Sequence, residues 1–314
     1  MPSPIVTLIV PGRDIEAYAP AAIASLQAQT ATRWRAILVD DGSLDATGDI
    51  FRDAASADTR FAVLEHTEPR GLGAARNAAL DRVDTEYLGF LDGDDELTPT
   101  ALERLTGTLS STGSDFVAGS YVRLRPNEDG SYSPGRVQPW TAAATDPQRL
   151  GTTIHDHPAA SANVVAWSKV SRTGFWGDER FPEDVAYEDQ IVAQRMYTRA
   201  HAFDVIPDVV VHWRLRAEGT SITQTKSQLP VLRDYLAALR GGIRILQRAG
   251  AHAAVTARLD LILAMDMAPL QEIAAVHPDP AYAAEVQAFL DELRALPEFR
   301  DARPDPDLAA ALSW

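Results

Sequence analysis

The stretch Tyr87-Leu-Gly-Phe-Leu-Asp92-Gly-Asp94-Asp95-Glu96 joins an apolar run to a dense group of acids. The run Tyr87–Leu91 has the length and composition of a buried strand, and the acids follow at its carboxyl end. Carboxylates this close repel one another unless a cation neutralises them, and hard divalent ions such as Mg²⁺ or Mn²⁺ prefer oxygen ligands. The stretch therefore predicts a metal site. An alternative is open here, because Thr98-Pro99 resembles a helix start and acids before a helix favour its dipole.

Strands and helices alternate regularly over the first 125 residues. Such spacing predicts an α/β fold with a parallel sheet, right-handed crossovers and helices on both faces. Ligands bind such sheets beyond the carboxyl ends of the strands, so Asp40-Asp41 and Asp92–Asp94 should open into one crevice. The expected strands are Ile5–Val10, Arg35–Val39, Phe61–Glu65, Tyr87–Leu91 and Phe116–Val122. The expected helices are Tyr18–Gln29, Asp45–Ala55, Gly71–Val83 and Pro99–Ser111.

The regular pattern ends near residue 125. Arg125–Trp140 is rich in Pro, Gly, Ser and Asn, and we expect a long loop there. We expect residues 1–125 and 126–225 to form two halves of one α/β domain, and residues 226–314 to form a helical region. The further elements expected are helices Tyr187–Arg199, Arg233–Arg248 and Ala251–Met265 and a strand Phe203–Val211. An apolar face on Leu259–Leu270 would favour self-association, so a homo-oligomer is expected through these helices.

The composition of the 314 residues limits the class of protein. A hydrophobic content of 46% is that of a globular protein. A net charge of −15 argues against nucleic acid as a partner, and the absence of cysteine excludes disulfides and thiolate metal sites. No run is long enough for an integral membrane segment, and the N-terminus lacks the features of a signal peptide. We therefore expect a cytoplasmic protein.

One motif suggests a different cofactor. Gly71-Leu-Gly73-Ala-Ala-Arg76 nearly matches the dinucleotide fingerprint. It follows the third expected strand, however, and Arg76 stands where a small residue must pack on the sheet. A nicotinamide or flavin enzyme is therefore not expected.

Several segments, taken in order, resemble family 2 glycosyltransferases. These enzymes have the GT-A fold, a Rossmann-like and mainly parallel sheet flanked by helices, and transfer sugars from nucleotide donors with inversion. The resemblance covers residues 4–100 closely and extends to about 225. At Gly12-Arg13-Asp14 the family usually has an aromatic residue and an asparagine. The matching segments are Val6–Asp14, Val39–Thr47, Gly71–Asn77, Phe90–Asp95, Trp167-Ser-Lys169, Tyr187-Glu188-Asp189, His212-Trp-Arg214 and Thr220–Thr223.

The resemblance implies a donor site in the N-terminal half. Asp40 or Asp41 would accept a hydrogen bond from the imide of uracil or thymine, although a helix-capping turn would also explain them. Asp92 would bind the ribose. Arg76 would brace Asp92 or touch the nucleotide, and its alternative is a surface arginine. The implied nucleotide- and donor-binding residues are Pro11, Asp14, Asp40, Asp41, Arg76, Asp92, Asp95, Arg214 and Ser221.

The resemblance also implies a metal ion and a base. Asp94 would ligate Mn²⁺ or Mg²⁺, which stabilises charge on the departing nucleoside diphosphate. His212 is a second candidate ligand, with a buried core histidine as the alternative. Asp189 would take the proton of the acceptor hydroxyl, and Glu188 would orient donor or acceptor. Acids in a first helical turn can also simply stabilise the helix dipole.

The acceptor side is defined less sharply. Arg214 and Arg216, followed by Gly219-Thr220-Ser221, could close over the diphosphate. Trp167 and Trp176 could stack on a sugar or belong to the core.

We therefore expect a glycosyltransferase that uses a UDP- or dTDP-sugar and an unidentified hydroxyl acceptor, which could be a glycan, a glycolipid precursor or a small molecule. It would act in polysaccharide or glycoconjugate biosynthesis. An inactive module that only binds nucleotide-sugar is one alternative. A sugar nucleotidyltransferase is another, although Pro11-Gly-Arg-Asp14 offers little of the basic glycine-rich loop it typically carries.

Overall fold

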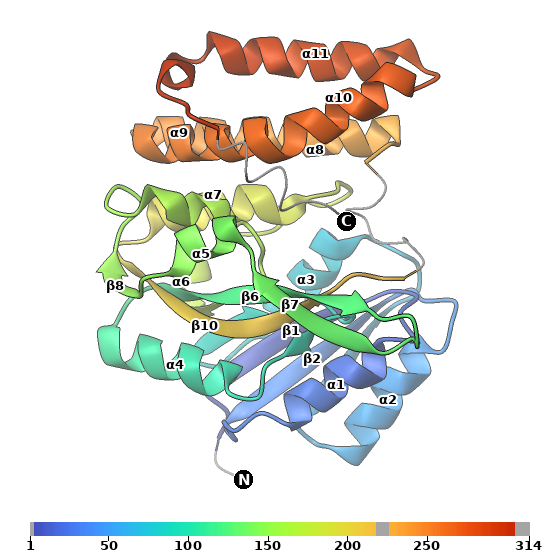
Figure 1. The fold of residues 1–314 in the computed structure, drawn as a ribbon. Coiled ribbons are helices and arrows are strands. Elements are labelled where there is room, and N and C mark those ends of the chain that lie inside the picture. Colours follow the sequence, from blue (N-terminus) through green and yellow to red (C-terminus); the bar gives the residue numbers. More distant parts are fainter. Residues whose placement is uncertain (1–2, 218–225, 305–314) are drawn as a thin grey trace.

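A computed structural model describes residues 3–217 and 226–304. Within these ranges the core is one sheet of ten strands in the order β3-β2-β1-β4-β9-β6-β10-β5, with β7 beside β6 and β8 beside β10. Helices flank the sheet, and a further layer of helices lies at one end of the molecule (Figure 1). The strands are β1 (Val6–Gly12), β2 (Trp34–Asp41), β3 (Phe61–His66), β4 (Tyr87–Phe90), β5 (Glu96–Leu97), β6 (Phe116–Pro126), β7 (Tyr132–Val137), β8 (Arg149–Thr152), β9 (Lys169–Arg172) and β10 (Phe203–Arg214). The helices are α1 (Ala19–Gln27), α2 (Thr47–Ala57), α3 (Leu72–Leu80), α4 (Ala101–Thr112), α5 (Pro139–Thr145), α6 (Thr173–Trp176), α7 (Glu188–Arg199), α8 (Leu229–Arg248), α9 (His252–Leu261), α10 (Met267–Val276) and α11 (Pro280–Ala295).

The N-terminal half shows the expected alternation of strands and helices. β1 lies between β2 and β4, β3 extends the sheet beyond β2, and all these pairings are parallel. Residues Val6–Val10 of β1 are almost fully buried, which explains why this strand is a continuous run rather than an alternating one. The carboxyl ends of β1, β2 and β4 meet at one edge of the sheet, which brings Gly12, Asp41 and Asp92 to the same place.

The sheet is mixed, because one strand runs against the others at its centre. β9 lies between β4 and β6 and pairs antiparallel with both, so β6 points in the same direction as β4 but does not pair with it. β5, β7 and β8 are also antiparallel to their neighbours. β9 has only four residues, two of them charged, so it carries no strand pattern that the sequence could reveal.

Arg125–Trp140 is not the long loop expected from its composition. β6 continues to Pro126, and β7 pairs with it antiparallel, with Pro134 opposite Leu124. β7 pairs with β6 alone, so proline is tolerated there because its missing N–H removes no bond to a second neighbour. Asn127, Gly130 and Ser131 belong to the tight turn of this hairpin, where Gly130 has a φ of +81°, and Ser133 and Gly135 lie in β7 itself.

Helices α8 to α11 form a layer that packs on α7 (Figure 1). The expected helix Ala251–Met265 is divided, because α9 ends at Leu261 and a π-helical turn, Ile262–Asp266, joins it to α10. Leu259 and Leu270 are almost fully buried within the chain, so this stretch does not present the apolar face expected to mediate self-association. Among the described helices, none combines the length and the apolarity that a bilayer span requires.

Candidate active site

An open pocket of about 660 Å³ lies where the carboxyl ends of β1, β2 and β4 face the loops of the second half of the sheet. The expected shared crevice is therefore present. Its charged lining residues are Arg13, Asp14, Asp41, Arg76, Asp92, Asp94, Asp95, Glu188, Asp189, Arg214 and Arg216. Its other lining residues are Pro11, Gly12, Ile15, Gly71, Leu72, Ala75, Gly93, Val165, Trp167, Tyr187 and Trp213.

Arg76 connects the two acidic motifs of the pocket. It lies on α3 with 1% of its side chain exposed. One guanidinium nitrogen donates to Asp92 Oδ1 at 2.6 Å, and the other forms an ion pair with Glu188. The expected contact between Arg76 and Asp92 is confirmed. Because both carboxylates are held by one buried cation, Glu188 acts here as a partner of Arg76.

The acids after β4 are held by arginines from β10 and the residues after it. Arg216 Nε donates to Asp94 Oδ2 at 2.8 Å. The backbone N–H of Arg214 donates to Asp95 Oδ1 at 2.8 Å, and its side chain pairs with Glu96. Burial raises the pKa of Asp94, and Arg216 opposes that shift. Arg214 and Arg216, which were expected to close over a diphosphate, are therefore paired with the acidic motif here, and Asp95 is buried against the backbone of β10.

The acids do not serve as a simple helix start. α4 begins at Ala101 rather than at Pro99. The Thr98 hydroxyl donates to the carbonyl of Val209 at 2.7 Å and does not cap the helix. Asp92, Asp94 and Asp95 instead line the pocket.

The donor set of the pocket fits a hard divalent cation in part. Asp92 and Asp94 supply carboxylate oxygens, and Mg²⁺ is commonly held by one or two carboxylates together with phosphate oxygens and water. Among the described residues, no group of three or more His, Asp or Glu side chains is arranged to hold a metal by itself. His212 does not line the pocket; it is half-buried and lies opposite Glu96 in the pairing of β10 with β5. Its role as a second metal ligand therefore stays a prediction.

Asp189 lies at the start of α7 and lines the pocket. Burial raises the pKa of Asp189 to about 7, and the neighbouring Glu188 adds to the shift. A carboxyl group with a pKa near neutrality can accept a proton and release it again at physiological pH. The residue before the helix, Tyr187, has a φ of +61°, which turns the chain sharply into this first turn.

Asp40 and Asp41 are separated by the structure. Asp40 does not line the pocket, and its Oδ1 accepts hydrogen bonds from the backbone and hydroxyl of Ser43. Asp41 does line the pocket, and it accepts from the backbone N–H groups of Arg70 and Gly71 at 2.9 and 2.8 Å. Asp40 therefore stabilises a turn, because its register on β2 points it away from the opening, and Asp41 fixes the entrance to α3.

The turn after β1 also forms part of the pocket wall. Pro11, Arg13 and Asp14 all line it. Asp14 has a φ of +51°, and its Oδ1 accepts from the backbone N–H of Leu44 at 2.8 Å. The turn that departs from the family pattern thus still closes this side of the pocket.

Of the two tryptophans expected to stack on a sugar or belong to the core, one lines the pocket and the other does not. Trp167 lines the pocket and packs edge-to-face on Tyr121 at 4.8 Å. Trp176 belongs to the core, where it packs on Phe90 and donates to the hydroxyl of Ser171 at 2.7 Å. Ser221 lies outside the described residues.

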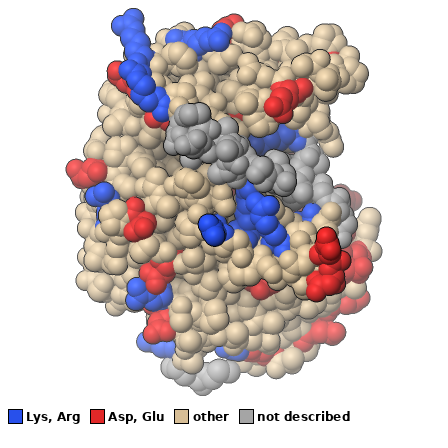
Figure 2. Space-filling view, in the orientation of Figure 1, with Lys and Arg blue, Asp and Glu red and all other residues tan. Residues whose placement is uncertain are grey.

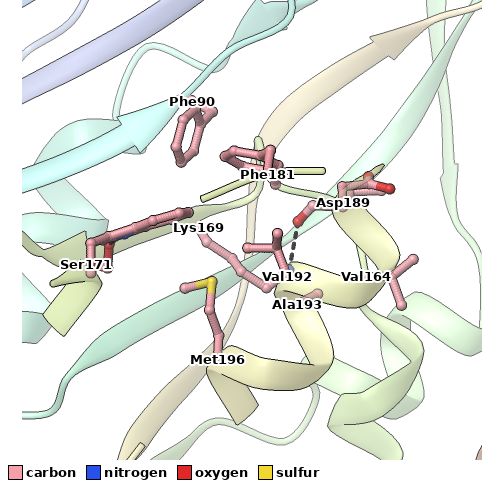
Figure 3. Close-up of a pocket in the computed structure, with 12 residues that line it drawn as sticks. Phe90, Val164, Lys169, Ser171, Phe181, Asp189, Val192, Ala193 and Met196 are labelled. Carbon is pink, nitrogen blue, oxygen red and sulfur yellow. Dashed lines mark hydrogen bonds between the residues drawn. The ribbon is translucent and has the colours of Figure 1, made fainter. Parts of the chain in front are cut away.

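A small cavity lies behind Asp189, between β9 and α7. Figure 3 shows Lys169 pointing toward the helix that carries Asp189. The Lys169 ammonium is buried and donates to the carbonyls of Asn163 and Val165 at 2.7 and 2.6 Å. Burial lowers the pKa of Lys169 to about 7, and Asp189 opposes that shift.

Sequence reasoning gave no role to three residues that the structure places at the site. Tyr187 and Trp213 line the pocket, and Lys169 lies behind it. All three fall inside the segments that resemble the family, which was the available signal. The sequence around a single aromatic residue or lysine in such a segment does not show whether its side chain lines a pocket or packs in the core.

Comparisons with known proteins agree with this architecture. The family model described as glycosyl transferase family 2 matches residues 7–164. Glycosyltransferase GlyA of Streptococcus pneumoniae is 24% identical over 233 residues, which cover 74% of this chain and 33% of GlyA. S. aureus TarS 1–349 superposes with a TM-score of 0.72 at 19% identity, over 93% of this chain and 81% of that one. Mannosyltransferase PcManGT from Pyrobaculum calidifontis, solved with GDP-Man and Mn²⁺, superposes with a TM-score of 0.58 at 17% identity, over 99% of this chain and 85% of that one.

The mixed sheet, the acidic pocket at its carboxyl edge and the likeness to TarS define the fold as the GT-A architecture of glycosyltransferases, with a helical C-terminal region. The chain belongs to glycosyl transferase family 2. It spans 33%, 35% and 44% of the length of three curated relatives that it matches.

Proposed function

We propose that the protein transfers a sugar from a UDP- or dTDP-sugar to an acceptor hydroxyl with inversion, assisted by Mn²⁺ or Mg²⁺. The observation that carries this proposal is the meeting of Asp92, Asp94 and Asp189 in one pocket. An inverting transfer needs a leaving-group site and a base on opposite sides of the anomeric carbon. The acidic motif after β4 and the start of α7 lie on two different walls and supply those two functions.

The nucleotide would lie against the N-terminal half. Pro11, Asp14 and Asp41 form one wall there, and Asp92 provides an acceptor for the ribose hydroxyls. TarS 1–349 has been solved in complex with UDP-GlcNAc and with UDP, which supports a uridine nucleotide as the first choice. Asp41 rather than Asp40 is the candidate acceptor for the imide N–H of the nucleobase, since only Asp41 lines the pocket.

The charges of the pocket support a role for a divalent cation. Seven carboxylates and four arginines line it. Arg76 is paired with Asp92 and Glu188, and Arg214 and Arg216 are engaged by Glu96 and Asp94. Arg13, the remaining arginine of the lining, is half-exposed and lies 3.5 Å from Asp14. A diphosphate would therefore meet a surplus of negative charge unless it enters with a cation.

Asp94, with Asp92 beside it, would hold that cation together with the donor's phosphate oxygens. The bound cation would stabilise the negative charge that develops on the diphosphate as the glycosidic bond breaks. PcManGT, which shares the fold, was solved with Mn²⁺.

The surface charge is uneven. Lys and Arg side chains gather near the centre of the face shown in Figure 2, although the net charge of the chain is −15.

Asp189 would act as the general base. Its ionised form accepts the proton of the acceptor hydroxyl as that oxygen attacks the anomeric carbon. Glu188 cannot share this role while Arg76 holds it, so Glu188 and Arg76 fix the turn that presents Asp189. Trp167 and Trp213 form the adjoining wall, where a sugar face of the acceptor can stack.

Thermal unfolding with UDP, dTDP, GDP and CMP, each with and without Mn²⁺, tests the donor site. A ligand that binds the native state raises the midpoint. We expect a metal-dependent rise with UDP or dTDP for the wild type, and its loss in Asp94→Asn. Asp208→Asn is the matched control, because Asp208 pairs with Arg104 on the surface and does not line the pocket.

The outcomes separate the alternatives. A rise that is independent of metal, without release of nucleoside diphosphate from any UDP- or dTDP-sugar, would favour a binding module without turnover. A response to GDP alone would keep the reaction class and correct the nucleotide. No response to any nucleotide would refute the proposed function.

A further inference from the structure

The first turn of α7 touches the C-terminal helices at several points. The ring of Tyr187 packs on the ring of Tyr235 from α8, with centroids 4.4 Å apart. The backbone N–H of Ala186 donates to the carboxylate of Asp234, also on α8, at 3.1 Å. The two residues that lead into Glu188 and Asp189 are therefore both held by one helix of the C-terminal region.

Tyr235 is itself fixed by its surroundings. Its hydroxyl donates to Asp266, at the end of the π-helical turn between α9 and α10. The Lys226 ammonium lies 3.9 Å from the centre of the Tyr235 ring and 3.6 Å from Asp266. A π-helical turn is rare and often marks a functional position, and here it places Asp266 where it meets Tyr235.

A second contact holds the other side of the same turn. Arg258 of α9 is 8% exposed and donates to the side-chain oxygen of Gln190 at 3.1 Å. Close packing continues along α7, since a Cβ on Gly241 would lie 3.0 Å from Ile191. Two helices of the C-terminal region thus contact the chain on both sides of Asp189, at Ala186 and Tyr187 before it and at Gln190 and Ile191 after it.

The local backbone needs such support. Tyr187 has a φ of +61° and a ψ of +35°, a left-handed conformation that is unfavourable for a residue other than glycine or asparagine. A residue in that conformation stays there only when its neighbours fix it. In the described structure the side chain of Tyr187 lies between the pocket and Tyr235, so Tyr235 is placed to fix it.

We propose that the C-terminal helices position the base of the reaction, with Asp234, Tyr235 and Arg258 as positioning residues for the turn Tyr187–Gln190. This inference rests on the proposed function, since it assigns a role relative to Asp189. It gives residues 226–304 a part in turnover rather than in donor binding. These residues do not line the pocket, so their effect passes through the turn.

Tyr235→Leu tests the proposal, because it removes the ring that supports Tyr187. We expect kcat for release of UDP from UDP-glucose, UDP-galactose or UDP-N-acetylglucosamine, whichever the wild type uses, to fall about 10- to 100-fold, as a displaced catalytic group predicts. The Kd for UDP with Mn²⁺ should stay within about twofold. Hydrogen exchange at the amides of Glu188–Gln190 should become faster. Tyr235→Phe keeps the ring and should recover most of kcat.

Arg240→Ala is the matched control, because Arg240 lies on the same helix but pairs with Glu292 of α11. Its kcat and exchange at α7 should match the wild type. Asp234→Ala, with a milder loss of kcat expected, serves if Tyr235→Leu does not fold. A folded Tyr235→Leu protein with normal UDP binding, kcat and exchange would overturn the proposal. A wild type that responds to none of UDP, dTDP, GDP and CMP and releases no nucleoside diphosphate would instead refute the proposed function, and the exchange measurement would still test the structural support.

Discussion

Arg76 on α3 and Glu188 at the start of α7 form a buried ion pair between residues 112 positions apart in the chain. The same guanidinium binds Asp92, so the wall proposed to bind the donor and the wall that carries Asp189 share one cation. The spacing between these two walls is therefore set by a side chain that is 1% exposed. An inverting reaction depends on that spacing, because attack and departure occur on opposite sides of one carbon.

Arg76→Met should be strongly destabilising. Removing the cation leaves two carboxylates unpaired in a buried site, which typically costs about 3–5 kcal/mol in the free energy of unfolding. Arg76→Lys should recover only part of this loss, since one ammonium does not reproduce a two-pronged contact. Urea unfolding measures both. Arg104→Met, which breaks the exposed pair with Asp208, should stay within about 1 kcal/mol, and an equally small effect for Arg76→Met would contradict the bridging role.

The pH dependence of turnover should report Asp189. Because its pKa is raised to about 7, the base is protonated and inactive below that pH and ionised above it. We expect kcat/KM, which reflects the free enzyme, to rise with pH and level off above about 7. For folding, the sign is opposite: the folded state binds a proton that the unfolded state has lost from about 3.8 upward, so stability falls as pH rises through this window.

Asp189→Asn checks the assignment of that rise. We expect turnover to fall by about 10² to 10⁴ and the remaining activity to lose the rise near neutrality. The Kd for UDP with Mn²⁺, measured by calorimetry, should stay unchanged, because Asp189 is proposed to contact the acceptor and not the nucleotide. A variant that keeps the wild-type pH profile would assign the titration to another group.

Lys169→Met should move the rise of kcat/KM with pH to higher pH. Lys169 favours the ionised form of Asp189, and its removal leaves burial and Glu188 to raise the pKa further. The carbonyls of Asn163 and Val165 also lose a donor, which costs about 1–3 kcal/mol of stability. Arg172→Met on the same strand is the control, because Arg172 pairs with Glu86 at the surface. Equal midpoints for the two variants would argue against coupling between Lys169 and Asp189.

Gly73→Ala should weaken the contact between the two walls. A Cβ there would lie 2.0 Å from the carbonyl oxygen of Pro182, so α3 or the loop before α7 must move. We expect a loss of about 1–3 kcal/mol in unfolding experiments and weaker UDP binding. Gly107→Ala, in the exposed part of α4 with open space around it, should instead stabilise by about 0.5–1 kcal/mol. A neutral Gly73→Ala would show that the contact adjusts at little cost.

The N-terminal half could be predicted from sequence because its signals are local. Buried parallel strands are continuous apolar runs, and the acids after β4 stand at a strand end, where such sheets bind ligands. The resemblance to family 2 glycosyltransferases, rather than these local signals, implied Pro11, Asp14, Asp41 and Arg76, and all four line the pocket.

Other features depend on contacts that no local pattern records. Asp40 and Asp41 are adjacent acids at one strand end, and only their register decides which lines the pocket. His212 lies opposite Glu96 in the pairing of β10 with β5 and does not line the pocket. The support of α7 by Tyr235 and Arg258 needs the tertiary packing of helices that carry no motif.

The antiparallel strand β9 also has a consequence for dividing the chain. Its four residues cover the edges of β4 and β6, and they begin at Lys169, after the family match ends at 164. A fragment that stopped at 164 would leave two central strands with unpaired N–H and C=O groups, a surface on which other chains can add and aggregate. The smallest piece that folds alone must therefore include β9, so the boundary of sequence similarity is not a boundary at which this protein can be cut.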